Sequence, residues 1–189
     1  MVDEVVDVRI KNDRILLIKL ILGDEAVNVI NVYAPQISLD DTSKRQFWED
    51  LDVVMQGIPA EEKIFIEGDF NAHVGNSRSG FENVHGGYSF EDRNDARNSI
   101  LNFSVSYDMI LANTWFRKLD FHLITYRSGG NASQIDFFLT RRLGRSCCLD
   151  CKVIPWECVA TSHRLLVLDV LFKKIYRKTR RVLNPRIKW

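Results

Sequence analysis

The chain has 189 residues, of which 46% are hydrophobic and 27% are charged, a composition typical of a globular domain with one core. No stretch reaches the roughly 18 uncharged apolar residues that span a membrane, because the longest apolar segment, 15–22, contains Lys19. The start, Met-Val-Asp-Glu, is acidic where a secretory signal is basic. We therefore expect an intracellular protein, nuclear or cytoplasmic, that does not enter a membrane.

The formal net charge of +1 hides an uneven distribution. The last segment, 173–189, contains eight bases and no acid: Lys173, Lys174, Arg177, Lys178, Arg180, Arg181, Arg186 and Lys188. Residues 1–172 hold the other 18 bases against 25 acids, a net charge of −7. We predict a folded domain over 1–172 and a basic tail or truncated linker over 173–189. The tail could bind phosphates, and a solvated terminal arm is the alternative.

Strands and two helices are expected in chain order. Val, Ile and Leu predict three strands joined by hairpin turns, Val5–Ile10, Arg14–Leu22 and Ala26–Tyr33. Helical spacing of Phe47, Leu51 and Val54 follows the N-cap residues at 40–43 and ends near Gly57. The remaining expected elements are a strand at Lys63–Glu67, a long surface loop at 72–92, a helix from about Asn94 to Tyr107, and strands at Met109–Leu111, His122–Tyr126, Gln134–Leu139, Leu149–Ile154 and Leu165–Leu171. One α/β domain is the economical interpretation.

Four cysteines occur close together, at positions 147, 148, 151 and 158. A Cys-x-x-Cys pair with a third cysteine seven residues later is compatible with a zinc site. No second pair follows, and the Lys-Val-Ile sequence after Cys151 is typical of a strand. Reduced structural thiols are the favoured interpretation, ahead of a metal site and of a disulfide.

The sequence Gly68-Asp69-Phe70-Asn71 ends the apolar run of the fourth predicted strand. Alternation along a strand places Asp69 and Asn71 on one side and Phe70 on the other, toward the core. An acid that orients water beside an amide that binds a phosphoryl oxygen suits phosphate chemistry. A turn is the alternative, because Gly, Asp and Asn are common turn formers.

Two further polar residues interrupt apolar segments. Asp136 lies inside Ser-Gln-Ile-Asp-Phe-Phe-Leu, where a buried carboxylate needs a partner. His163 directly precedes another predicted buried strand. A carboxylate bonded to one imidazole nitrogen fixes the tautomer and leaves the other nitrogen for substrate, so Asp136 and His163 could form such a pair. A hydrogen-bonded core histidine is the alternative.

Four motifs occur in the order Asn-x-Tyr-x-Pro, Gly-Asp-x-Asn, Ile-Asp-Phe and Ser-His, each at the end of a predicted strand. Together they resemble the endonuclease/exonuclease/phosphatase family, which includes abasic-site endonucleases, deoxyribonuclease I and LINE-type retrotransposon endonuclease domains. The resemblance covers about Val5 to Val170. Phrases such as Asn31-Val-Tyr-Ala-Pro-Gln36 and Cys151-Lys-Val-Ile-Pro155 are similar to the craniofacial development protein 2-like branch, whose nuclease domain derives from an RTE-type retrotransposon.

The resemblance implies a fold, an activity and a role for each matching residue. The fold would be a DNase I-like α/β sandwich of mixed, largely antiparallel sheets flanked by helices. Asp69 would activate water and hold Mg²⁺ or Mn²⁺, and Asn71 would hold the phosphate. Tyr33 would bond a phosphate oxygen or the leaving group, while Asp136 would orient His163, which stabilises developing charge. DNA would be the partner, with no small-molecule cofactor.

Two departures from the family pattern stand out. The family's domain begins upstream of the position that corresponds to Met1, with an Asn-bearing strand and a second strand ending in a Glu metal ligand. Neither Glu4 nor Glu25 sits in an equivalent motif, and Thr161-Ser162-His163 stands where many members have Ser-Asp-His. We therefore expect a domain that is incomplete at its amino terminus, binds metal weakly and has little activity alone.

Three functions compete on the sequence alone. The first is a metal-dependent DNA endonuclease of retrotransposon origin. The second is a non-catalytic pseudo-nuclease that binds nucleic acid or a protein partner through residues 173–188. The third, ranked last, is a metal protein built on the cysteine cluster.

Overall fold

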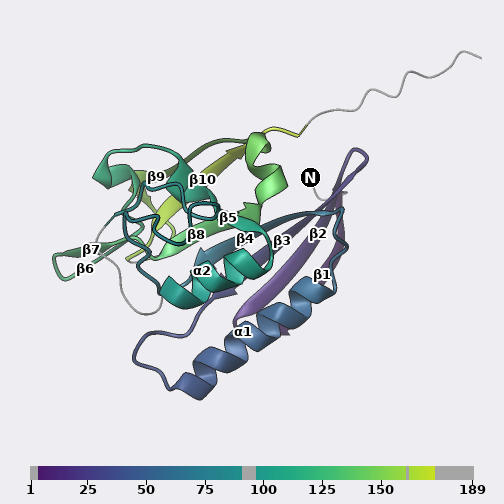
Figure 1. Cartoon of the computed structure of the whole chain (residues 1–189), viewed down its shortest axis with the longest axis horizontal. Coiled ribbons are helices and arrows are strands. Elements are labelled where there is room, and N and C mark those ends of the chain that lie inside the picture. Colours follow the sequence, from purple (N-terminus) through teal and green to yellow (C-terminus); the bar gives the residue numbers. More distant parts are fainter. Residues whose placement is uncertain (1–3, 91–96, 161, 173–189) are drawn as a thin grey trace, which may run out of the picture.

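A six-stranded mixed sheet forms the centre of the protein, with strand order β1-β2-β3-β4-β8-β5 (Figure 1). The computed structural model describes residues 4–90, 97–160 and 162–172. The central strands are β1 (Val5–Asn12), β2 (Ile15–Leu22), β3 (Glu25–Tyr33), β4 (Lys63–Asp69), β5 (Met109–Leu111) and β8 (Asp136–Arg141). The other elements are α1 (Asp41–Gln56), α2 (Arg97–Ser106), the β6–β7 hairpin (Tyr126–Ser128, Asn131–Ser133), the β9–β10 pair (Cys148–Cys158, Arg164–Val170) and the 3-10 helices η2 (Ala112–Trp115), η3 (Asp120–His122) and η4 (Arg142–Cys147).

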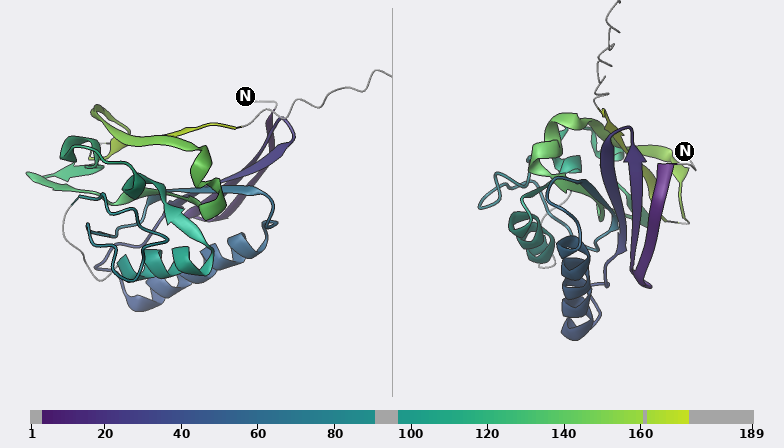
Figure 2. Two further views of the ribbon diagram at one scale, coloured as in Figure 1. Left: turned by 45° about the horizontal axis from the view of Figure 1, so that its top comes forward. Right: turned by 90° about the vertical axis from the view of Figure 1, so that its right-hand side faces the viewer.

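The layers are visible from the side in Figure 2, where α1 and α2 lie against one face of the central sheet and β9–β10 lies over the other. The three amino-terminal strands form the antiparallel meander that their hydrophobic runs predict. Helix α1 then crosses over to β4, which pairs parallel to β3, and β8 pairs antiparallel to β4. The chain thus has the predicted α/β class. No helix of the described segments is long and apolar enough to cross a bilayer.

Helix α1 is anchored by its cap and by one apolar stripe. Asp40 accepts a hydrogen bond from the Ser43 amide at 2.9 Å, which satisfies one of the otherwise unpaired donors of the first turn. Phe47, Leu51 and Met55 recur every four residues and are buried against the sheet. The helix ends at Gly57 as expected, and its stripe forms one side of the core.

The core lies between the helices and the central sheet. Strand alternation or helical spacing points its fully buried side chains into this layer. They include Ile15, Ile30, Leu51, Ile64, Ile66, Ile100, Leu101, Leu111, Phe137 and Leu139. Burial of these large aliphatic and aromatic groups is the main favourable term for folding.

One expected strand is wrong, and most of the others differ in their bounds by one to four residues. Residues 122–125 do not form a strand, because the Leu123 and Ile124 amides donate back to the Asp120 carbonyl in the turn of η3. Strand β8 begins two residues later than expected, since the amides of Ile135 and Asp136 donate to a side-chain hydroxyl, that of Thr125. Strand β9, which we expected at Leu149–Ile154, is longer and runs from Cys148 to Cys158.

Proline explains the irregular pairing in β9. The register jumps from the Leu165–Ile154 pair to the Arg164–Cys158 pair, so residues 155–157 have no partners in β10. Pro155 lacks the amide that the ladder would need at this point. The sequence that we expected to end the strand therefore bulges, and pairing resumes beyond it.

The long connection after β4 has no helix or strand over residues 72–90 but is not confined to the surface. Ala72, Val74, Val84, His85 and Ser89 are buried. Gln134 Oε1 accepts from both the Ser89 hydroxyl and the Phe90 amide, which ties the connection to the start of β8. The expected helix start near Asn94 and the basic tail 173–189 lie outside the described residues.

Gly68 permits the close approach of β4 to β3 that places Asp69. Its φ is +142°, and a Cβ built at this position would lie 1.9 Å from the Val32 carbonyl oxygen. Such a contact is impossible without moving the backbone of a central strand. Gly68 is therefore required by both its conformation and its surroundings.

We predict that Gly68→Ala lowers the free energy of unfolding by at least about 2 kcal/mol, because strain and a backbone clash combine. Gly23→Ala is the matched control, since Gly23 has a φ of +68° but no atom within 4 Å of the added Cβ. The control should cost only about 1 kcal/mol. Urea denaturation followed by circular dichroism measures both, and equal losses would contradict a special role for the β3–β4 approach.

Candidate active site

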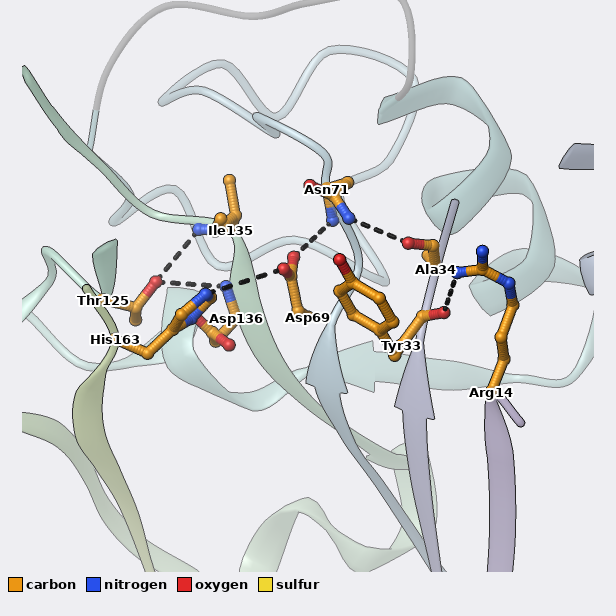
Figure 3. A network of polar contacts seen from close by, with 9 residues as sticks. All are labelled: Arg14, Tyr33, Ala34, Asp69, Asn71, Thr125, Ile135, Asp136 and His163. Atoms are coloured by element: carbon orange, nitrogen blue, oxygen red, sulfur yellow. Dashed lines mark hydrogen bonds and ion pairs between the residues drawn. The ribbon is translucent and has the colours of Figure 1, made fainter. Parts of the chain in front are cut away.

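Three polar residues meet at one end of the central sheet because their strands end there. Asp69 is the last residue of β4 and Asp136 is the first of β8, and the two are direct partners in the antiparallel ladder. Tyr33, the last residue of β3, is the partner of Asp69 on the other side. Figure 3 shows these side chains grouped at the strand ends.

His163 joins this group from the second sheet. It directly precedes β10, forms an isolated bridge with Tyr126, and packs edge-on against that ring at a centroid distance of 4.9 Å. Its Nδ1 atom lies 3.2 Å from Asp136 Oδ2, and its Nε2 atom lies 3.9 Å from Asp69 Oδ2. The imidazole is thus placed between two carboxylates, with one ring nitrogen directed at each.

Asn71 does not continue the strand, so the expected alternation with Asp69 does not apply to it. Its φ is +48°, in the left-handed region. Its backbone amide donates to Asp69 Oδ1 at 2.8 Å, which is the Asx turn that Gly-Asp-x-Asn favours, and its side-chain Nδ2 donates to the Ala34 carbonyl at 2.8 Å. Phe70 is buried in the core as predicted. The segment is therefore a turn that also presents an acid and an amide.

The position of Tyr33 leaves its phenol accessible. The residue is 45% exposed at the rim of the site. Arg14 donates to the Tyr33 carbonyl at 3.2 Å and holds its guanidinium carbon 5.4 Å from the ring centroid. A cation and a phenolic hydroxyl therefore lie beside the two carboxylates, on the side away from His163 (Figure 3).

The electrostatics of Asp69 are unusual for an aspartate. Burial raises its pKa from 3.8 to about 6, the backbone amide of Asn71 opposes that rise, and the neighbouring charge of Asp136 adds to it. Only 11% of the side chain is exposed. A carboxylate with such a pKa is ionised at neutral pH yet basic enough to accept a proton from water.

A cavity of about 310 Å³ opens in front of these residues and adds Asn31, the first residue of the Asn-x-Tyr-x-Pro motif, and Glu67, which no motif indicated. Glu67 and Asn31 line it together with Asp69, Asp136 and His163. Asn31 Nδ2 donates to Glu67 Oε1 at 2.5 Å, and burial raises the pKa of Glu67. The available signal was the two-residue spacing from Glu67 to Asp69, which puts both on one face of β4.

The donor set fits a hydrated divalent cation better than a tightly held one. Mg²⁺ and Mn²⁺ take oxygen ligands, and Asp69 and Asp136 present two neighbouring carboxylates whose mutual repulsion a cation would relieve. In the described part of the chain, however, no group of three or more His, Cys, Asp or Glu side chains is arranged to hold an ion. One or two carboxylates plus substrate phosphate is a common Mg²⁺ arrangement.

The cysteine cluster contains free thiols at all four positions. Burial raises the pKa of Cys148 to about 11 and also raises that of Cys151, so both are neutral thiols at physiological pH. Cys158 Sγ accepts a hydrogen bond from Arg164 at 2.8 Å. Metal binding requires thiolates, which this environment disfavours.

The arrangement of strands and helices is the DNase I-like α/β fold, shared with nucleases and phosphatases of known structure. The endonuclease domain of TRAS1, a telomere-specific non-LTR retrotransposon, superimposes with a TM-score of 0.59 at 12% identity, over 85% of this chain and 65% of that one. The 3′ phosphatase NExo from Neisseria, bound to a product DNA hairpin, gives 0.60 at 15% identity over 84% and 65%. An AP endonuclease from Archaeoglobus fulgidus gives 0.58 at 18% identity over 88% and 71%.

Sequence comparison gives a more particular relationship. Craniofacial development protein 2 from Bos taurus is 28% identical over 180 residues, which is 94% of this chain and 30% of the relative. The same protein from Tragulus javanicus is also 28% identical over 180 residues, covering 31% of its length. This chain therefore spans about a third of the curated relatives it matches. No protein-family model matches the sequence.

We predict that Asp69→Asn stabilises the metal-free protein at about pH 7.5, by at most about 3 kcal/mol. A raised carboxyl pKa means that the folded state binds the proton more tightly than the unfolded chain. The stabilisation from this protonation is present below about pH 3.8 and is lost as the pH rises through about 6. Asparagine keeps the Asx turn and removes the ionisation, so its advantage should disappear near pH 4.

Thermal unfolding in a chelating buffer at several pH values measures this effect. Asp13→Asn is the control, because Asp13 is an exposed turn residue that loses the same formal charge. A gain for Asp69→Asn that stays constant between pH 4 and pH 7.5 would contradict the electrostatic origin.

Proposed function

We propose that this protein is a divalent-metal-dependent phosphodiesterase that cleaves DNA, an endonuclease of retrotransposon origin. The observation that carries the proposal is the position of the His163 imidazole between Asp136 and Asp69, at the strand ends beside Tyr33. The fold shared with the TRAS1 endonuclease domain and the sequence similarity to craniofacial development protein 2 support the same class. The catalytic roles of these residues stay predictions.

Each side chain has a role that its contacts allow. Asp69 orients the attacking water and accepts its proton, since burial raises its pKa to about 6. Asp136 holds the imidazole by Nδ1, which leaves Nε2 of a protonated His163 as a donor to a phosphate oxygen. Asn71 offers its second amide hydrogen to the same phosphate, and the exposed phenol of Tyr33 lies beside the leaving oxygen.

A bound Mg²⁺ or Mn²⁺ would polarise the phosphate and neutralise the charge that develops on it. Asp69 and Asp136 are the residues that would hold it. Because the described site offers so few carboxylates, we expect millimolar rather than micromolar metal requirements and modest turnover.

The alternative is a binding module without catalysis, favoured by the sparse carboxylate set together with the eight bases of residues 173–188. Such a module would bind nucleic acid equally well with or without Asp69. The basic residues lie outside the described structure, so this alternative rests on their charge alone.

We predict that the protein nicks supercoiled plasmid in the presence of Mg²⁺ or Mn²⁺, and that Asp69→Ala and His163→Ala each lower the rate by at least about 100-fold. Asp136→Asn should lower it by a comparable factor, since asparagine keeps the shape of the side chain but removes the charge that fixes the tautomer and stabilises the imidazolium. Gel analysis of open-circular product against time gives the rates.

Two controls separate catalysis from contamination and from misfolding. Asp13→Asn should nick at the wild-type rate, and every variant should keep the wild-type circular dichroism spectrum. Wild-type protein that nicks no faster than Asp69→Ala at any metal concentration would reject the enzyme and leave the binding module.

A further inference from the structure

A second cavity, of about 740 Å³, lies away from the candidate active site. Nine described residues line it: Asn83, Ile110, Trp115, Phe116, Arg142, Leu143, Arg145, Ser146 and Cys148. They combine two arginines, two aromatic rings and two aliphatic side chains, and none of these nine is acidic. Its volume is in the range of pockets that take small organic ligands.

The guanidinium of Arg145 stacks on the ring of Trp115 in this cavity. The guanidinium carbon of Arg145 lies 4.0 Å from the centroid of Trp115, and that of Arg78 lies 5.8 Å from the same ring. Both arginines are exposed, but Arg78 is held by hydrogen bonds from Nε to the His85 carbonyl at 3.0 Å and from Nη2 to the Glu82 carbonyl at 3.1 Å. Among the described residues no carboxylate lies within ion-pair distance of Arg145, so its hydrogen-bonding edge faces solvent.

The other arginine is held in place at the cavity wall. Arg142 Nε donates to Asp108 Oδ1 at 2.7 Å, and its backbone amide donates to the Asp108 carbonyl at 2.8 Å. That bond uses one of the five N–H donors of a guanidinium. Asp108 neutralises this charge, which leaves the unpaired charge of Arg145 to set the sign of the cavity.

The described part of the chain ends beside this cavity. The Leu171 amide donates to the Cys147 carbonyl at 2.8 Å, so the described chain ends at Phe172 close to η4. Figure 1 shows this yellow end next to the green η4 helix, on the side opposite the β6–β7 hairpin. The sequence that follows Phe172 contains eight bases and no acid.

The cavity and the candidate active site lie at opposite ends of β8. Asp136 begins this strand, and Arg142 follows its last residue. At 3.4 Å per residue the six positions from Asp136 to Arg142 correspond to about 20 Å. A ligand in the cavity therefore does not touch the reacting phosphate.

We propose that this cavity is a binding site for an unpaired nucleotide of a single-stranded nucleic acid. An exposed arginine edge binds phosphate, and aromatic rings with stacked guanidinium planes offer a flat surface for a base. The absence of acids among the lining residues removes the repulsion that a polyanion meets in the other cavity. The site requires no metal and holds whether or not Asp69 supports hydrolysis.

The test measures binding of a fluorescein-labelled oligothymidylate of about 12 nucleotides by fluorescence anisotropy, with the full chain in chelating buffer. Arg145→Glu should weaken binding by at least about 10-fold and lower the salt slope, and Arg145→Gln should reduce that slope by about 1. Arg145→Lys should recover only part of the affinity, because an ammonium keeps the charge but loses the planar stack.

Arg45→Glu is the matched control, since Arg45 is an exposed arginine of α1 and gives the same charge change. It should alter affinity by less than about 3-fold, and Asp69→Ala should leave the effect of Arg145→Glu intact. The proposal is overturned if Arg145→Glu and Arg45→Glu weaken binding equally. It is also overturned if a poly-glutamate peptide, and not the oligothymidylate, binds in an Arg145-dependent way, because the occupant would then be a protein.

Discussion

The antiparallel register of β4 and β8 determines the character of the site, because it places Asp69 directly opposite Asp136. Like charges in opposed positions of a sheet destabilise it, and the charge of Asp136 adds to the rise in the pKa of Asp69 that burial causes. The structure retains the pair and brings a third group, His163, to within 3.9 Å of one carboxylate and 3.2 Å of the other. The two-stranded β9–β10 sheet must therefore pack where β10 can deliver this ring. The position of the second sheet and the close approach of the two carboxylates are therefore linked through His163.

Local sequence patterns were sufficient for most elements, and their failures have physical causes. The first three strands and α1 followed from hydrophobic period and turn residues, which are properties of neighbouring positions. The prediction of a strand at 122–126 was wrong for Leu123 and Ile124. These apolar residues are buried, but they lie in a turn in which their amides donate to the Asp120 carbonyl. The start of β8 was missed because the hydroxyl of Thr125, ten residues away, takes amides that a strand would otherwise use. Contacts of that kind depend on tertiary structure, which no local window contains.

The sequence predicted the residues of the site only where they belonged to a recognisable motif. Asp69, Asp136 and His163 interrupt apolar runs, and the structure brings them together, although nothing in the runs themselves states that residues 69 and 163 meet. Asn71 was assigned to a strand face, whereas the chain turns at this position with a φ of +48°. Glu67 was missed because a charged residue near the end of a strand usually faces solvent. Here its side chain lines the same cavity as Asp69. Burial, rather than residue type, makes it part of the site.

On the functions that we propose, the two cavities have different tasks. The cavity at the strand ends contains Glu67, Asp69 and Asp136, so its own field repels phosphates until a cation neutralises it. Attraction for the polyanion must therefore come from elsewhere on the surface, and it acts over a distance of about 10 Å at moderate salt. On our proposal, Arg145 in the cavity at the far end of β8 supplies part of that charge. If affinity and chemistry reside in different places as we propose, loss of metal binding would leave a protein that still binds nucleic acid. The proposed enzyme and the alternative binding module would then differ only in whether the site at the strand ends holds a cation.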